Sequence, residues 1–371
     1  MLAPLRVEAP VYHDAVGGRY VVTRHADVKA LLANRELCVD PRKANPGTYA
    51  ARLLAANGGA KIELSMIDMD APDHRRVRSL VTKAFTVSAV EALRPKTRAL
   101  AEQLLDAVTE PEFDFMPAFA DPFPTTVIAE MLGIDPSMRD QFKVWSTITI
   151  ERFDPTNTAE RLAEIVAGEE GLRDLLFHEI AARRAAPRND LIGRLAEARE
   201  GGERLTDKEI VAQCQLLLVA GNTTTSDLIG NGLKNLIERP EQLAYLRAHP
   251  DVLPNAVEEM LRYDPSVDCT RRIAHTDLEV AGCPIAKGEY IYLSIASANH
   301  DENLYTDPDR FDVRRPQIRH VAFGGGDHLC LGAPLARLEA QEAFRAILGR
   351  FRHIGLSPRG HRYRVVPNFR G

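Results

Sequence analysis

The stretch Phe323–Arg337, F-G-G-G-D-H-L-C-L-G-A-P-L-A-R, places one cysteine behind three consecutive glycines. Glycines in a row have no side chains to pack and cost backbone entropy, so they are expected where the chain turns tightly or approaches another group closely. The residues after Gly332 have helical periodicity, with Pro334 in the first turn and no further breaker before Gly349. Cys330 therefore lies just before a helix N-terminus, where backbone N–H groups and the helix dipole favour a thiolate. We interpret the stretch as a loop that presents a sulfur anion to something large and flat.

Composition narrows the class of protein. The chain has 371 residues, 45% of them hydrophobic, which is typical of a globular protein with a substantial core. Its formal net charge of −5 and the lack of a long basic run argue against nucleic-acid binding. The opening residues contain no long apolar run that would form a signal peptide or a membrane anchor. The five cysteines have no paired spacing, so we expect reduced thiols and a cytoplasmic protein without membrane contact.

Strand signals are confined to two places, near residues 18–23 and over residues 277–294, where Ala286–Gly288 has the chemistry of a turn. Most of the remaining chain has the periodicity of amphipathic helices, as in residues 91–108 and 160–184. We therefore predict a mainly α fold with a minor β component (α+β). Because the short N-terminal strand is expected to join the later strands, we predict one domain over residues 1–371.

One predicted helix is long and apolar. Thr206 and Glu209 have the spacing of a capping box, and Pro240 marks the end of the helix. Some thirty residues would span roughly 45 Å, so the helix must cross the core. Its centre, Ala220–Thr225, reads A-G-N-T-T-T. Either the threonines bond back to a carbonyl one turn earlier and bend the helix, or Ala220 and Gly221 leave a flat place for a planar ligand with hydroxyls beside it.

Two further motifs carry charge. Glu259 and Arg262 stand three apart on one predicted helix face, a spacing that by itself is common on helix surfaces. With a third member from the turn-rich stretch D-P-D-R-F, which contains Arg310, they could form a buried network that pins loops to a helix. His74 and Arg78 share another helix face, where they are either solvated or a clamp for an anion.

Together and in this order, the motifs resemble those of the cytochrome P450 family, the haem-thiolate monooxygenases, in its soluble bacterial class. The cysteine loop F-G-x-G-x-H-x-C-x-G, the pair E-x-x-R, the segment A-G-x-(acid)-T-T and the pattern H-x-x-x-R all have counterparts from about Val11 onward. The resemblance implies the P450 fold, with a long central helix over the haem and small β-sheets. Thr223 stands where relatives have the acid, and the chain ends at N-F-R-G.

The resemblance implies that Cys330 is the axial ligand of haem b, whose iron then favours O–O cleavage. A zinc site is disfavoured, because His328 and Cys330 lack a second pair at ligand spacing. In the stretch T-R-R-I-A, Arg272 resembles the propionate-binding arginine of the family better than Arg271 does. The implied haem contacts are His74, Arg78, Ala220, Gly221, Thr224, Arg272, Ala322, Phe323, Gly324, His328, Cys330 and Gly332. The implied structural triad is Glu259, Arg262 and Arg310.

The implied reaction inserts one oxygen atom of O₂ into a small apolar organic substrate. No flavin or nicotinamide fingerprint is present, so electrons are expected from a ferredoxin served by a ferredoxin reductase. An acidic partner would suit basic residues near the cysteine, for which the candidates are Arg75, Arg76, Lys83 and Arg337. A peroxide-driven enzyme, a haem isomerase or dehydratase, and a haem sensor stay open as alternatives. We expect a monomer.

Catalysis and substrate binding are assigned by the same resemblance. Thr224 is the implied oxygen-side hydroxyl, while Asn222 or Thr223 would order water for a slow proton delivery, with Asp227 as a further candidate. The substrate is not identified by the sequence. The residues expected to line its pocket are Leu216, Val219, Val267, Asp268 and Cys269.

Overall fold

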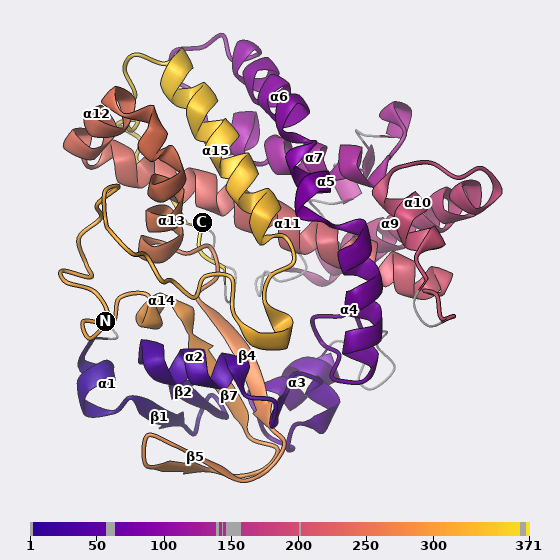
Figure 1. Ribbon diagram of the computed structural model, residues 1–371, viewed down its shortest axis with the longest axis vertical. Coiled ribbons are helices and arrows are strands. Elements are labelled where there is room, and N and C mark those ends of the chain that lie inside the picture. The colour runs from indigo at the N-terminus through magenta and orange to yellow at the C-terminus, as the bar shows by residue number, and fades with distance from the viewer. Residues whose placement is uncertain are drawn as a thin grey trace. The chain divides into compact units, whose positions relative to one another are not determined.

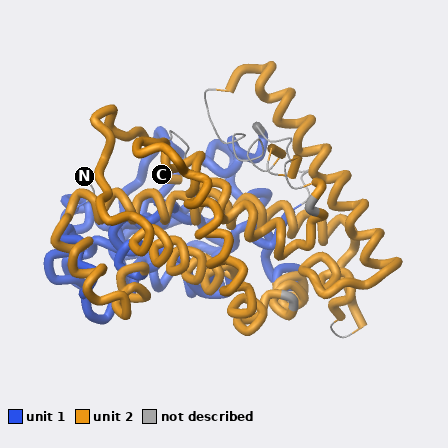
Figure 2. Tube along the Cα trace, turned by 90° about the horizontal axis from the view of Figure 1, so that it is seen from above, with its two compact units in different colours: residues 1–74, 258–330 blue, residues 75–257, 331–371 orange. Residues whose placement is uncertain are grey.

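The computed structural model describes residues 3–56, 64–138, 141–142, 144–145, 157–199, 202–363 and 369–371. The chain divides into two compact units, which Figure 2 distinguishes by colour. Unit 1 consists of residues 1–74 and 258–330, and unit 2 consists of residues 75–257 and 331–371. One domain over residues 1–371 stays a prediction.

Unit 1 contains all the regular strands of the described residues. Its strands are β1 (Val11–Asp14), β2 (Arg19–Val22), β3 (Leu37–Cys38), β4 (Cys269–Ala274), β5 (Leu278–Val280), β6 (Cys283–Ile285) and β7 (Tyr290–Ser294). Its helices and short turns are α1 (Ala3–Glu8), α2 (His25–Ala33), η1 (Pro41–Lys43), α3 (Tyr49–Ala56), α14 (Ile295–Ala298) and η6 (Gly326–His328).

The strands form two sheets. The larger has the order β1-β2-β7-β4-β3, and β5 pairs with β6 in a separate hairpin. β2 runs parallel to β7, with Tyr20 opposite Ile291, which confirms that the N-terminal strand joins the later ones. The strands expected over residues 277–294 are present, and the predicted turn contains Gly288 at φ 84°. β1, β3 and β4 were not predicted, because they are short or interrupted by charged residues.

Figure 1 shows α2 beside the strands of the larger sheet, and side chains of both form a hydrophobic core of unit 1. Val28, Leu31 and Leu32 of α2 pack against side chains of the strands, such as Ile291 and Leu293. These aliphatic residues recur at helical spacing on α2 and at alternating positions on β7. The packing fixes the end of α2, where Leu32 lies against Gly326 of the cysteine loop.

Unit 2 is helical. Its elements are α5 (Val87–Glu91), α6 (Arg94–Asp106), the π-helix η3 (Met116–Ala120), α7 (Pro122–Leu132), η4 (Pro136–Met138), α9 (Ala159–Ala185), α10 (Leu191–Glu197), α11 (Asp207–Ile237), α12 (Pro240–Ala248), η5 (Pro250–Val252) and α15 (Ala333–Arg350). Two more helices contain residues of both units, α4 (Asp73–Ala84) and α13 (Leu253–Tyr263).

α11 is the predicted long helix, with 31 residues. Its capping box is confirmed, because the Thr206 side chain accepts from the Glu209 N–H and the Glu209 carboxylate accepts from the Thr206 N–H. The helix ends at Ile237, and Pro240 begins α12. α11 contacts α7, α9 and α15 within unit 2, and Figure 1 shows it running across these helices.

Helix boundaries elsewhere largely follow the periodicity. α9 covers the predicted residues 160–184, and α15 begins at Ala333 as expected. The predicted helix over residues 91–108 is instead divided between α5 and α6, with a proline in the first turn of α6. Proline has no N–H to donate, so it is tolerated there and marks a new helix start. Among the described residues, no helix combines the length and the apolar character needed to cross a bilayer.

Candidate functional site

The loop before α15 closes tightly around Cys330 in unit 1. Gly324 and Gly326 have φ angles of 69° and 65°, which only glycine adopts without strain. A Cβ on Gly326 would collide with the carbonyl oxygen of Leu32 at the end of α2. The Cys330 N–H donates to the Phe323 carbonyl at 2.9 Å and closes the loop. The glycines therefore permit a tight turn and a close approach of the loop to the end of α2, as the sequence predicted.

Cys330 differs from the buried cysteines in its surroundings. Its side chain is exposed, whereas Cys38, Cys214 and Cys269 are buried. Burial raises the pKa of Cys38 to about 11 and the pKa values of Cys214 and Cys269 to about 12. A thiolate is the form that binds a metal, so these three thiols are poorly suited to that role. The exposed Cys330 is therefore better suited to bind a metal than these three cysteines are.

A buried arginine in unit 1 has no carboxylate within ion-pair distance among the described residues. Arg272 is 4% exposed, and its guanidinium donates to the carbonyls of Arg271 at 2.7 Å and Leu32 at 3.3 Å. Burial and the neighbouring Arg271 lower the pKa of Arg272 to about 10. Arg271 instead pairs with Asp68. A buried cation held only by neutral carbonyls suits an anionic ligand.

Two imidazoles lie together in the same unit. The His74 and His328 ring centroids are 4.1 Å apart, which joins the start of α4 to the cysteine loop. His74 is buried, and Arg78 follows it on α4 in unit 2. Ala322, Phe323 and Gly324 are half-buried, and Gly332 is the N-cap of α15.

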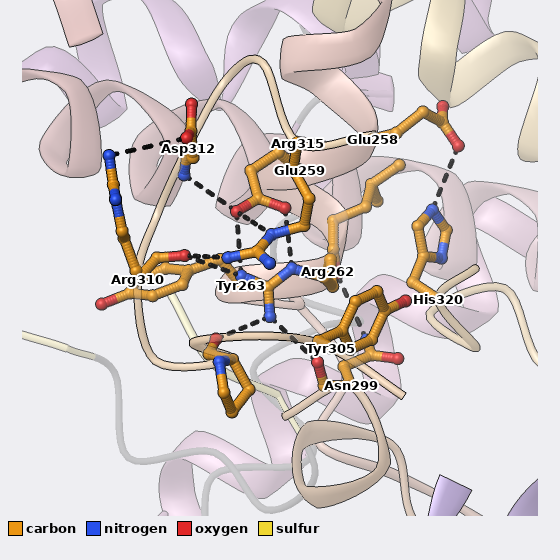
Figure 3. A network of polar contacts seen from close by, with 12 residues as sticks. Glu258, Glu259, Arg262, Tyr263, Asn299, Tyr305, Arg310, Asp312, Arg315 and His320 are labelled. Carbon is orange, nitrogen blue, oxygen red and sulfur yellow. Dashed lines mark hydrogen bonds and ion pairs between the residues drawn. The ribbon is translucent and has the colours of Figure 1, made fainter. Parts of the chain in front are cut away.

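The predicted triad is present with one member changed (Figure 3). Arg262 donates to both oxygens of Glu259, at 2.7 and 2.9 Å, and both side chains are fully buried. Arg315 is the third member, since its Nε donates to Glu259 Oε1 at 3.1 Å. The prediction of Arg310 is wrong. Its side chain is 60% exposed and pairs with Asp312 at 3.7 Å, so only its backbone carbonyl joins the network, accepting from Arg262 and Arg315.

One face of α11 in unit 2 is less buried than the rest of the helix. Leu216, Val219 and Thr224 are half-buried on this face and Ala220 is exposed. The Thr224 hydroxyl donates to the Ala220 carbonyl at 2.5 Å, which confirms the back-bonding interpretation for this residue. A Cβ on Gly221 would lie 2.5 Å from Ile128 Cδ1, so the end of that α7 side chain would have to shift to admit a larger residue.

The other polar residues near the centre of α11 lie on its buried side. Asn222 and Thr223 are each 4% exposed, and the Thr223 hydroxyl has no hydrogen-bond partner within the described residues. Asp227 is fully buried, and a Cβ on Gly371 would collide with its carboxylate. Thr223 and Thr224 therefore face different surroundings.

A buried carboxyl that the sequence reasoning missed lies against α11. Glu339 of α15 is 1% exposed, and its carboxyl interacts with the Thr225 hydroxyl. Burial raises the pKa of Glu339 well above its ordinary value, against the opposite effect of Thr225. The periodicity of α15 gave a signal, because Leu335, Glu339 and Glu342 fall on one stripe of the helix.

The residues expected to line a substrate pocket lie in both units. Leu216 and Val219 belong to the less buried face of α11 in unit 2. Val267 and Asp268 are half-buried before β4, and Cys269 is buried as its first residue. Lining a common pocket stays a prediction for these residues.

Comparison with known proteins decides the family. The family model for cytochrome P450 matches residues 21–359. The chain belongs to the cytochrome P450 family. Cytochrome P450 107B1 of Saccharopolyspora erythraea is 39% identical over 360 residues, covering 95% of this chain and 87% of that protein. The 6-deoxyerythronolide B hydroxylase of the same organism is 36% identical over 365 residues, covering 95% and 88%.

A solved P450 structure has the same fold. P450BioI in complex with an acyl carrier protein carrying hexadec-9Z-enoic acid superposes with a TM-score of 0.88 at 33% identity, covering 99% of this chain and 94% of that chain. The fold is therefore the mainly helical P450 fold with small sheets. Cytochromes P450 are oxidoreductases whose cofactor is a cysteine-ligated haem. These residues fit that cofactor. The exposed thiol of Cys330 suits the haem iron, and the buried guanidinium of Arg272 suits a haem carboxylate.

Proposed function

We propose that this P450 is a monooxygenase in which Cys330 would bind the haem iron, and that it inserts one atom of O₂ into a small apolar organic substrate. The observation that carries the proposal is the cysteine loop, in which positive-φ glycines and the bond from Cys330 N–H to Phe323 hold a single exposed cysteine. When bound, a haem with a thiolate ligand supplies an iron whose electron density favours O–O cleavage.

The side chains of this P450 have separate tasks in the proposed reaction. Arg272, with His74, Arg78 and His328, would neutralise the haem carboxylates, since carboxylates bind well to cations and imidazole donors. Phe323 would shield the sulfur from water. In unit 2, Ala220 and Gly221 have no large side chains, and the Thr224 hydroxyl would hold a proton beside the reacting oxygen.

The electrons are proposed to come from a ferredoxin and its reductase. α4 presents Arg75 and Lys83 as exposed cations, which suits an acidic protein. Arg76 contributes less, because it pairs with Glu209 and lies 3.6 Å from Glu203. We further propose that the protein acts as a monomer in the cytoplasm, which size-exclusion chromatography and cell fractionation would check.

Relatives suggest the compounds to screen. Similar proteins include 6-deoxyerythronolide B hydroxylase, a P450 in complex with hexadec-9Z-enoic acid on its carrier protein, and a P450 in complex with testosterone. These proteins suggest apolar compounds for the screen. The haem absorption band is measured while each compound is added. A shift of the band reports that the compound has bound close to the haem.

Two measurements test the function. The reduced protein with carbon monoxide should show the absorption band of a thiolate-ligated haem, and a compound that binds should be converted with one ¹⁸O atom from ¹⁸O₂. A supplied ferredoxin, reductase and NADPH should support turnover. Conversion with hydrogen peroxide alone, and none with ferredoxin, would replace this proposal by the peroxide-driven alternative. If the absorption band of the carbon monoxide complex does not lie at the position typical of a thiolate-ligated haem, the proposal is refuted.

A further inference from the structure

The segment that leads into the cysteine loop, residues 319–322, is held by side chains from elsewhere in unit 1. The Arg319 N–H donates to the Tyr305 hydroxyl at 3.0 Å, and the Arg319 carbonyl lies 2.9 Å from His25 Nε2. The Val321 N–H donates to Asn299 Oδ1 at 2.8 Å. Backbone polar groups of this segment therefore bond to side chains instead of to a neighbouring strand.

His320 is the central side chain of this segment. It is 5% exposed, and its two ring nitrogens have different partners. Nε2 lies 3.1 Å from Glu258 Oε2, and Nδ1 lies 3.2 Å from the Ala322 N–H. A carboxylate can only accept and an N–H can only donate, so the neutral ring with its proton on Nε2 satisfies both partners. The contacts thus select one tautomer and one ring orientation.

Both attachments lead back to the buried triad, and Figure 3 shows the contact between Glu258 and His320. Glu258 lies on α13 directly before Glu259, which Arg262 and Arg315 hold. The Asn299 carbonyl accepts from Arg262 at 3.0 Å, while its side chain holds Val321. The triad is buried, and a movement of its members would break several charge-assisted bonds. The segment is therefore fixed to the triad at two points.

Contacts continue from His320 to the sulfur ligand. Ala322, which donates to the ring, precedes Phe323, and the His320 and Phe323 rings lie 5.7 Å apart. The Phe323 carbonyl accepts from the Cys330 N–H at 2.9 Å and closes the loop. A change in the orientation of His320 would release the Ala322 N–H and move the residue that receives the Cys330 bond.

We propose that Glu258 and His320 are positioning residues that connect the buried triad to the cysteine loop and hold Cys330 in its ligating conformation. This rests on the proposed role of Cys330 as the haem ligand. Neither side chain touches the reacting atoms in this scheme. Glu258 fixes the imidazole, the imidazole fixes the Ala322 N–H, and the Phe323 carbonyl that follows fixes the backbone of Cys330.

Three variants separate the two contacts of the ring. His320→Phe removes both. His320→Asn keeps an acceptor for the Ala322 N–H, but its shorter side chain no longer contacts Glu258. Glu258→Gln replaces the carboxylate with a neutral amide oxygen that still accepts the Nε2 proton. His300→Phe is the matched control, because His300 also contacts a carboxylate, Asp309, and a backbone carbonyl, that of Tyr263.

The experiment measures two properties of the haem-loaded proteins. The first is hydrogen exchange in a peptide over residues 321–331, and the second is the share of the carbon monoxide complex that shows the thiolate band. His320→Phe should exchange roughly fivefold to tenfold faster, the change expected for one lost hydrogen bond beside a donor left unpaired. It should also lose part of the thiolate band. His320→Asn should recover only part of both, because it keeps the acceptor for Ala322 but not the contact with Glu258. Glu258→Gln should resemble the wild type.

Several results would overturn the proposal. Equal readouts for His320→Phe and His300→Phe would show that the ring does not hold the loop. Losses in His320→Asn as large as those in His320→Phe would show that the acceptor for the Ala322 N–H is irrelevant. The proposal would also be contradicted if Glu258→Gln lost the thiolate band while its hydrogen exchange over residues 321–331 stayed at the wild-type rate. If the wild type itself lacks the thiolate band, the proposed function fails, while the exchange rates still report whether the pair holds the loop.

Discussion

The Nε of Arg315 donates to Oε1 of Glu259 at 3.1 Å, although 56 positions separate the two residues in the chain. The same carboxylate oxygen accepts from the Asp312 N–H at 2.9 Å. Arg315 also donates to the carbonyls of Thr306, Asp307 and Arg310. One arginine thus connects the turn-rich segment around residues 306–312 to α13, and Figure 3 shows its contacts with Glu259 and Arg310.

Removal of this arginine should destabilise the protein. Arg315→Ala leaves the Glu259 carboxylate buried with one cation fewer, and we expect a loss of about 3–5 kcal/mol in the free energy of unfolding together with poor haem retention. Arg310→Ala is the control, because its exposed side chain should contribute no more than about 0.5 kcal/mol. Denaturant unfolding of both variants measures the difference. Equal losses would restore Arg310 as a member of the triad.

Replacement of the sulfur ligand should separate cofactor retention from turnover. We expect Cys330→His to keep some haem, since imidazole also binds iron, but to lose the thiolate band and the oxygenase activity. Cys283→Ser is the control, because Cys283 is a half-buried thiol that the cysteine loop does not include. Oxygenase turnover retained by Cys330→His would refute the assignment of the ligand.

The buried carboxyl of Glu339 should make stability fall as the pH rises. Its folded pKa is raised, so the folded state keeps a proton that the unfolded state releases above its ordinary pKa of about 4.5. The resulting loss of stability grows with pH until the folded pKa is reached. Glu339→Gln keeps the shape and removes the titration.

Thermal unfolding at pH 5 and pH 8 checks this expectation. Glu339→Gln should be more stable relative to the wild type at pH 8 than at pH 5. Glu342→Gln should behave in the opposite sense, because arginines 94 and 98 lower the pKa of Glu342 against the effect of burial. Identical pH dependence of the wild type and Glu339→Gln would show that this carboxyl is already ionised in the folded protein.

The hydroxyl of Thr224 should govern how efficiently reducing power becomes product. Thr224→Val keeps the shape of the side chain and removes its donor, so we expect the ratio of product to NADPH consumed to fall severalfold. Thr224→Ser keeps the hydroxyl and should stay near the wild type. The ratio is measured with a substrate that binds both variants. A well-coupled Thr224→Val enzyme would show that the hydroxyl has a structural role only, such as its bond to the Ala220 carbonyl.

Arg272 should affect retention of the cofactor more than folding. Arg272→Met removes a buried charge that carbonyls alone hold in the described structure, so it should cost little stability. It should nevertheless speed the transfer of haem to an acceptor such as apomyoglobin. Arg271→Met, which breaks the pair with Asp68, is the comparison. Faster haem loss from Arg271→Met than from Arg272→Met would reverse the assignment.

The sequence by itself determined the features that depend on neighbours along the chain. The capping box of α11 and the tight loop at Gly324–Gly326 follow from local spacing and from backbone angles that only certain residues adopt. The start of α15 is predicted by the same kind of signal. Such features need no knowledge of distant contacts, because their energies arise within one or two turns of backbone.

Only the tertiary structure decided which distant residues meet. Arg310 and Arg315 both follow a turn and are alike in local chemistry, and the fold alone directs the second toward Glu259. The pairs Glu339–Thr225 and His320–Glu258 likewise join segments more than sixty positions apart. The strength of these contacts comes from burial, which raises the cost of an unpaired polar group. Burial is a property of the packed fold, and spacing along the chain does not encode it.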